Sequence, residues 1–169
     1  YRILDIADLT VEGSIAMGAA IAAQAITHGI NPYIATGLAL IGGMAAGLVT
    51  GLLHTKLKIP ALLSGILTMI ALYSINLRIL GKANVSLLRM ETVYTPFENM
   101  GLARNSAVIT LGLLCVLGMI SILYWFFGTE IGCAIRATGN NPNMVRAQGI
   151  NTNTTKILGL VISNGLVAV

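Results

Sequence analysis

Long uncharged apolar runs alternate with short polar stretches along this chain. The two firmest runs, residues 34–53 and 107–127, contain 20 and 21 residues without a charged side chain. At a rise of about 1.5 Å per residue, each run is long enough to cross the roughly 30 Å of hydrocarbon in a bilayer. The pattern predicts membrane-spanning helices.

Three weaker runs complete the pattern. One opens with Pro60, which the first turn of a helix tolerates, and carries Asn76 and Arg78 only near its far end. Another is rich in alanine, and the last is cut by the end of the chain. We therefore expect an all-α, polytopic membrane helical bundle that forms one domain over residues 1–169 and is truncated at both ends. The expected spans are residues 15–30, 34–53, 59–80, 107–127 and 157–169, with a polar loop at residues 128–156.

Composition supports the membrane interpretation. Charged residues make up 9% of the chain, against roughly 25% in an average soluble domain. Hydrophobic residues make up 56%, and the mean hydropathy is +0.84. The positive charges are dispersed among the polar stretches, which argues against a nucleic-acid-binding face.

Positive charge is distributed unevenly between the two sides of the expected bundle. If the spans alternate direction, one side carries six positive residues and the other carries three. Cytoplasmic loops are enriched in lysine and arginine, so we expect the richer side to be cytoplasmic. The richer side holds Arg2, Lys56, Lys58, Arg136, Arg146 and Lys156, and the poorer side holds Lys82, Arg89 and Arg104.

Small residues recur at every fourth position of the second span. This spacing places them on one helix face, where another helix can approach closely. Static close packing is the favoured interpretation, and a moving interface or pathway wall is the alternative. The residues are Ala35, Ala39, Gly43, Gly47 and Gly51.

No catalytic or metal site is expected. The spans carry no charged residue near their middles, and Arg78 lies close enough to a helix end to reach the interface. His28 and His54 fall on opposite sides of the expected bundle, and Cys115 and Cys133 have no ligand spacing. Residues 124–127, which read Tyr-Trp-Phe-Phe, are typical of an interfacial aromatic belt.

The polar loop contains a short helix with both ends marked. Asn141 is a good N-cap, Pro142 suits the first helical position, and Gly149 suits a left-handed stop. A helix this short is marginal alone, so we expect it to dock against another surface.

Three blocks in the same order give the chain a family resemblance. The loop reads T-x-x-G-x-x-x-R-A-x-G-x-N-P and then R-A-x-G-I, which resembles the coupling loop of ABC importer permeases in the branched-chain amino acid and ribose permease superfamily. Residues 8–14, D-L-T-V-E-G-S, and residues 57–61, L-K-I-P-A, resemble two further elements of that superfamily. The variant D-L-T-V-E-G-S is more similar to the subgroup linked to aromatic or related amino acids than to the sugar subgroup. The matching loop residues are Thr129, Gly132, Arg136, Ala137, Gly139, Asn141, Pro142, Arg146, Ala147, Gly149 and Ile150.

The resemblance implies a multi-pass permease subunit in a prokaryotic plasma membrane. It implies a second permease subunit, two ABC ATPase subunits that bind ATP and magnesium, and an extracytoplasmic substrate-binding protein. Residues 141–148 would insert into a groove of the ATPase, and Gly139 and Gly149 would set the turns. Arg136 or Arg146 would pair with acidic residues there, while this chain itself would bind no cofactor.

A second set of polar residues marks the start of the first span. Asp8, Thr10, Glu12 and Ser14 lie where a helix dipole and free backbone amides would face an anionic group of the substrate. The alternative is capping, in which these side chains bond the first-turn amides. A loop at residues 81–105, with Tyr94, Pro96 and Phe97, is either a docking surface for the binding protein or a re-entrant gate.

These features predict the permease subunit of an ATP-driven importer for a small polar nutrient, with an amino acid favoured over a sugar. An ion-coupled secondary carrier or channel is the first alternative, and it predicts a role for Arg78. A purely structural membrane subunit is the second. It predicts no loss of transport when the helix at residues 141–148 is disrupted.

Overall fold

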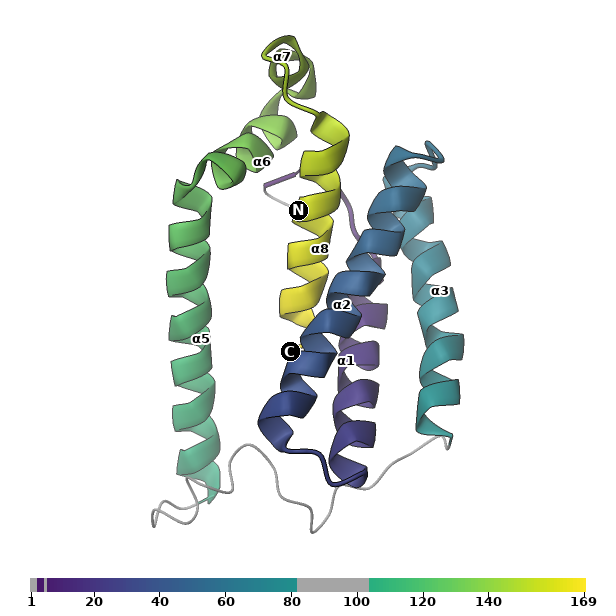
Figure 1. Cartoon of the computed structure of the whole chain (residues 1–169), viewed down its shortest axis with the longest axis vertical. Helices are drawn as coiled ribbons and strands as arrows, with labels where there is room; N and C mark the ends of the chain where they lie inside the picture. The colour runs from purple at the N-terminus through teal and green to yellow at the C-terminus, as the bar shows by residue number, and fades with distance from the viewer. Residues whose placement is uncertain (1–2, 5, 82–103) are drawn as a thin grey trace.

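The computed structural model describes residues 3–4, 6–81 and 104–169, and every regular element in these ranges is an α-helix (Figure 1). The expected all-α class is therefore confirmed for the described residues. The helices are α1 (Thr10–Thr27), α2 (Pro32–Thr55), α3 (Ala61–Leu80), α5 (Arg104–Gly128), α6 (Glu130–Asn140), α7 (Pro142–Ala147) and α8 (Thr152–Val167).

A helix overlies each of the five expected spans, with shifted ends. α1 begins at Thr10 rather than at residue 15, and α8 begins at Thr152 rather than at residue 157. Among the described residues, α2, α3 and the range Val108–Gly128 of α5 have the length and apolar composition to cross a membrane. These helices support a membrane-embedded bundle.

Helix ends follow local capping rules. The Asn31 side chain accepts the Tyr33 amide at the start of α2, where Pro32 occupies the first position. Gly81, with φ 61°, ends α3 in the left-handed region that glycine adopts without strain.

The small-residue face of α2 is the surface on which α8 packs (Figure 1). A Cβ atom built on Gly47 would meet the Leu160 carbonyl, and one built on Gly51 would lie 3.1 Å from the Ile157 Cα. Because backbone lies against backbone, larger side chains at these positions would force the two helices apart. α1 packs on α2 and on α3. Helices α1, α2, α3 and α8 therefore form one block.

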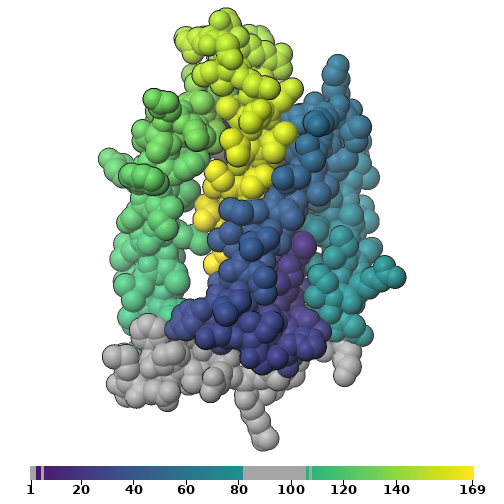
Figure 2. Space-filling view, viewed as in Figure 1, coloured from purple at the N-terminus to yellow at the C-terminus, as the bar shows by residue number. Residues whose placement is uncertain are grey.

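α5 lies apart from this block. None of its membrane-length window is buried, and among the described elements it contacts only α6. Figure 2 shows the green α5 separated from the yellow and blue helices over much of its length. Tyr124 and Trp125, in the expected aromatic belt, are 86% and 74% exposed.

The two ends of the bundle differ in charge. The turn between α2 and α3 lies at the same end as α6 and α7, while the turn between α1 and α2 lies at the other (Figure 1). The described members of the expected positive side lie toward the first end: Lys56, Lys58, Arg136, Arg146 and Lys156. Arg2, Lys82 and Arg89 lie outside the described residues, as do Tyr94, Pro96 and Phe97 of the loop expected to be a docking surface or a re-entrant gate.

Candidate functional site

The polar loop expected at residues 128–156 is mostly helical. Sequence reasoning missed α6, an amphipathic helix of 11 residues whose N-cap Thr129 accepts the Gly132 amide at 3.3 Å. Gly132 and Gly139 lower helix propensity and concealed it, although Thr129 followed by Glu130 was an available start signal. We call residues 129–150, which comprise α6 and α7, the α6–α7 arm.

The short helix expected at Asn141 is present as α7. The Asn141 side chain accepts the Met144 amide at 3.1 Å, Pro142 occupies the first position, and Gly149 has φ 81°. Both end signals therefore act as the sequence predicted.

Buried contacts dock the arm on α8. Ile135 and Val145 are each 2% exposed, and the Thr138 and Thr155 hydroxyls share a buried hydrogen bond of 2.9 Å. The Arg146 Nε donates to the Thr152 hydroxyl at 2.8 Å. α7 is therefore held by the bundle rather than standing free.

One expected coupling residue, Gly139, differs from its predicted role, and a second, Arg136, makes a contact within the chain that was not predicted. Gly139 does not set a turn: it lies within α6, where a Cβ would meet the Ile3 carbonyl and lie 2.9 Å from the Leu4 Cα. Its small size permits the N-terminal segment to cross α6 closely. Arg136 donates to the Phe127 carbonyl at 2.9 Å, which ties α6 back to α5.

The remaining members of the expected set lie at the surface of the arm. Ala137 and Ala147 are exposed, and Ile150 is 36% exposed. Their side chains are available to a partner.

Asp8 accepts two hydrogen bonds at the start of α1. Its Oδ1 accepts the Thr10 amide at 2.9 Å, and its Oδ2 accepts the Asn164 side-chain amide at 2.7 Å. The first bond is a capping contact and satisfies one of the free donors of the helix start. The second reaches across to α8.

Thr10 and Ser14 extend this cluster between the helices. The Ser14 hydroxyl donates to Asn164 Oδ1 at 2.6 Å, and the Thr10 and Thr50 hydroxyls share a hydrogen bond of 2.8 Å. Thr10, Ser14 and Asn164 are 0% exposed. We call Asp8, Thr10, Ser14, Thr50 and Asn164 the polar cluster.

Glu12 does not join the polar cluster and is exposed. Asn164 was missed by sequence reasoning, and its only signal was an amide side chain inside an apolar run. The structure thus brings together three of the four residues expected at the start of the first span.

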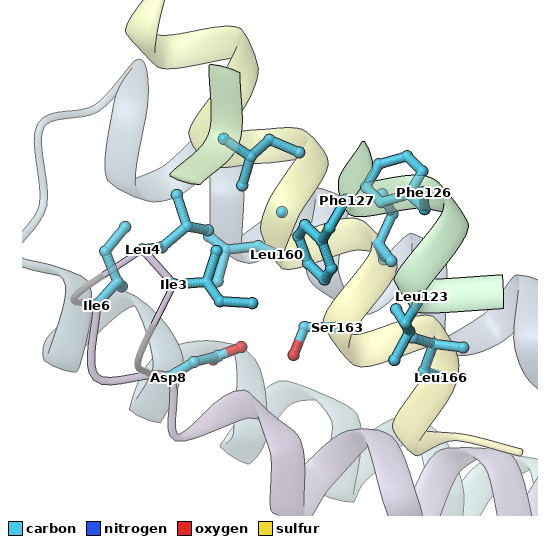
Figure 3. Close-up of a pocket in the computed structure, with 13 residues that line it drawn as sticks. Ile3, Leu4, Ile6, Asp8, Leu123, Phe126, Phe127, Leu160, Ser163 and Leu166 are labelled. Atoms are coloured by element: carbon cyan, nitrogen blue, oxygen red, sulfur yellow. The ribbon is translucent and has the colours of Figure 1, made fainter. Parts of the chain in front are cut away.

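A cavity of about 340 Å³ lies between the N-terminal segment, α5, α6 and α8. In Figure 3, the side-chain oxygens of Asp8 and Ser163 lie on the same side of this cavity, and Phe126, Phe127 and Leu123 from α5 lie across from the N-terminal segment. The lining is otherwise apolar. It consists of Ile3, Leu4, Ile6, Asp8, Leu123, Phe126, Phe127, Ile135, Gly159, Leu160, Ile162, Ser163 and Leu166.

The other candidate groups are scattered over the described part of the chain. His28 Nε2 lies 3.2 Å from the Gln24 side chain, whereas His54 Nδ1 lies 2.9 Å from the Ile59 carbonyl. The Cys133 sulfur accepts a hydrogen bond of 3.4 Å from Arg136 Nη2. Arg78 is exposed in the last turn of α3.

Comparisons with known protein families and with curated proteins both point to transport permeases. The family described as branched-chain amino acid transport system, permease component, matches residues 1–169. A tyrosine transport system permease protein of Clostridioides difficile is 45% identical over 99% of this chain and 54% of its own length. An uncharacterised protein of Rickettsia prowazekii is 33% identical over 99% of this chain and 57% of its own length.

A more distant relative is the ribose import permease protein of Escherichia coli, 28% identical over 89% of this chain and 47% of its own length. The chain thus spans about half the length of the curated relatives it matches. No solved structure matches. The match over the whole chain, together with the apolar helices and the three sequence blocks, shows that this protein belongs to the branched-chain amino acid transport system permease family of ABC transporter permeases.

Proposed function

We propose that this chain is part of the permease subunit of an ATP-driven ABC importer in a prokaryotic plasma membrane. The observation that carries the proposal is the placement of α7. Val145 and Arg146 anchor it to the bundle, while its apolar Met144 is 59% exposed. An anchored helix with an exposed apolar side chain suits a docking partner that pushes on the bundle.

The proposed partner at α7 is an ABC ATPase subunit, which would bind ATP and Mg²⁺. A second permease subunit and an extracytoplasmic substrate-binding protein complete the proposed assembly. In it, the end of the bundle that carries the arm and the positive residues faces the cytoplasm. The exposed residues Ala137, Ala147 and Ile150 of the arm are proposed to belong to the same contact as Met144.

Co-purification tests the ATPase contact. The full-length tagged protein is isolated in mild detergent, and Met144→Glu is compared with Thr154→Glu, a change at an exposed position of α8 outside the arm. Met144→Glu is expected to reduce recovery of the ATPase at least about tenfold, because a charge at the centre of an apolar contact loses its solvation. Thr154→Glu is expected to leave recovery unchanged.

If the parent protein recovers no ATPase in several detergents, the importer proposal fails. An ion-coupled carrier then becomes the leading alternative, with Arg78 as the residue to test. If Met144→Glu and Thr154→Glu behave alike, α7 is not the contact.

The proposed cargo is a small polar nutrient, an amino acid rather than a sugar. The support is the higher identity to a relative named for tyrosine transport than to one named for ribose import. Within the candidate pathway, Asp8 lines the cavity, Thr10 and Ser14 support it from the polar cluster, and Glu12 is exposed on α1. Uptake of L-tyrosine and of ribose by proteoliposomes that contain the assembled transporter tests this choice, and uptake of ribose alone would overturn it.

A further inference from the structure

α8 connects the α6–α7 arm to the polar cluster. Its first turns carry Thr152 and Thr155, which bond Arg146 and Thr138 of the arm. Asn164 lies in the same unbroken helix, about 18 Å further along its axis at 1.5 Å per residue. A displacement of the arm therefore reaches Asn164 through a continuous rigid element.

Asn164 uses both ends of its amide to hold α1. Its Nδ2 donates to Asp8 Oδ2 at 2.7 Å and to the Leu160 carbonyl at 3.0 Å, and its Oδ1 accepts from Ser14 at 2.6 Å. Asn164 is 0% exposed, and its bonds to Ser14 and to the Leu160 carbonyl are buried, whereas its bond to Asp8 is part-buried beside the cavity. From its position in α8, Asn164 therefore bonds both Asp8, which precedes α1, and Ser14, which lies in α1.

The N-terminal segment, residues 3–9 without residue 5, is held at its other end as well. A Cβ on Gly139 of α6 would meet the Ile3 carbonyl, and a Cβ on Gly159 of α8 would meet the Leu4 side chain. The segment thus starts against the arm and α8 and ends at the bond between Asp8 and Asn164. Between these points it lines the cavity.

We propose that Asn164 is a positioning residue that makes Asp8 and the start of α1 follow α8 when the arm is displaced by the ATPase. This inference rests on the proposed function and deepens it, because it assigns the link between the ATPase contact and the cavity wall. A purely structural Asn164 would set the amount of folded transporter. A positioning Asn164 sets how much transport each ATP hydrolysed drives.

An exchange of the Asp8 and Asn164 side chains tests whether Asn164 positions Asp8. In Asn164→Asp, two carboxyl groups meet and the donor to Asp8 is lost. In the double variant Asp8→Asn with Asn164→Asp, the amide at position 8 donates to the carboxylate at position 164, which still accepts from Ser14. The bond from position 164 to the Leu160 carbonyl is lost in both variants, so the comparison between them isolates the bond to position 8. The matched control is Thr68→Val, since Thr68 is 3% exposed and, among the described residues, its hydroxyl bonds the Ser64 carbonyl of its own helix.

The measurement is the ratio of L-tyrosine imported to ATP hydrolysed in proteoliposomes that contain the full-length permease, its ATPase and its binding protein. We expect Asn164→Asp to lower this ratio at least about tenfold at equal assembly, as for the loss of a part-buried hydrogen bond to a charged group. The double variant is expected to recover most of it, and Thr68→Val to keep it.

Each outcome decides the question. If Asn164→Asp lowers import and hydrolysis in proportion, or if the exchange does not restore the ratio, Asn164 does not position Asp8. This inference then fails while the proposed function stands. If the parent assembly neither hydrolyses ATP nor imports L-tyrosine, the proposed function falls and takes this inference with it. The parent thus tests the proposed function, and the variants test the link.

Discussion

The Asn164 side-chain amide donates a hydrogen bond of 2.7 Å to the Asp8 carboxylate, across a sequence separation of 156 residues. This bond joins the start of α1 to α8, next to the surface where α8 packs on α2. Because the Asn164 side chain is fully buried, the bond helps to specify which helices are neighbours. The opposite case occurs in α3, where a buried side-chain amide has no such partner among the described residues.

Replacing Asn76 with leucine is expected to stabilise the protein. Asn76 is 6% exposed, and neither polar atom of its side chain has a hydrogen-bond partner among the described residues. Leucine has the same branched shape without the unmet polar groups, so the free energy of unfolding should rise by about 1–3 kcal/mol. The thermal unfolding midpoint of the full-length protein in detergent checks this. A lower midpoint would mean that the Asn76 amide bonds a group outside the described residues.

Two glycines of α2 are expected to respond oppositely to alanine. A Cβ on Gly47 would meet the Leu160 carbonyl and lie 2.9 Å from the Val161 Cα, so Gly47→Ala should cost about 1–3 kcal/mol of stability. Gly37 has no neighbour within 4 Å of an added Cβ, so Gly37→Ala should be neutral or stabilise by up to about 1 kcal/mol. Thermal unfolding of the two variants side by side provides the comparison. Equal effects would contradict the close approach of α2 and α8.

The Thr138 and Thr155 hydroxyls are expected to be energetically coupled. Each single change to valine should cost about 1 kcal/mol, because it removes one side of a buried hydrogen bond. The double variant should cost less than the sum, because the second change removes a hydroxyl that has already lost its partner on the other helix. Denaturation of the four proteins in this cycle measures the coupling. The pair Thr138→Val and Thr68→Val, on separate helices, should be additive.

Loss of the Arg146 side chain should loosen α7 locally. Arg146→Met removes the bond to Thr152, and the α7 amides should exchange hydrogen about fivefold faster, as for about 1 kcal/mol. Arg136→Met removes bonds at the junction of α5 and α6 and should leave α7 exchange unchanged. Hydrogen exchange with mass spectrometry resolves the two segments. Faster exchange of α7 in Arg136→Met alone would show that the arm is anchored at α6 instead.

Features set by neighbouring residues were predicted from the sequence. The cap at Asn141 and the stop at Gly149 depend on side chains and dihedral angles within a few residues, and both are present. Long apolar runs likewise place α2, α3 and α5, because a bilayer requires about 20 apolar residues in a row.

Features set by distant contacts were not predicted. The sequence predicts a loop where α6 lies, because the apolar side of this helix is recognised only once α8 packs on it and because its glycines are typical of loops. Gly139 was expected to set a turn, yet it lies where the N-terminal segment crosses the helix. In both cases the deciding contact comes from a segment remote in the chain.

The division between these two kinds of feature has a physical cause. Hydrophobic length, helix caps and the family motif are properties of short stretches, so the residues alone established a membrane helix bundle of the ABC permease family. The partners of Asp8, Ser14 and Thr10 depend on how α1, α2 and α8 pack, since a buried polar side chain bonds whatever the fold brings within about 3 Å. The tertiary structure alone therefore decided that Asn164 holds the start of α1 and that α8 links the arm to the cavity.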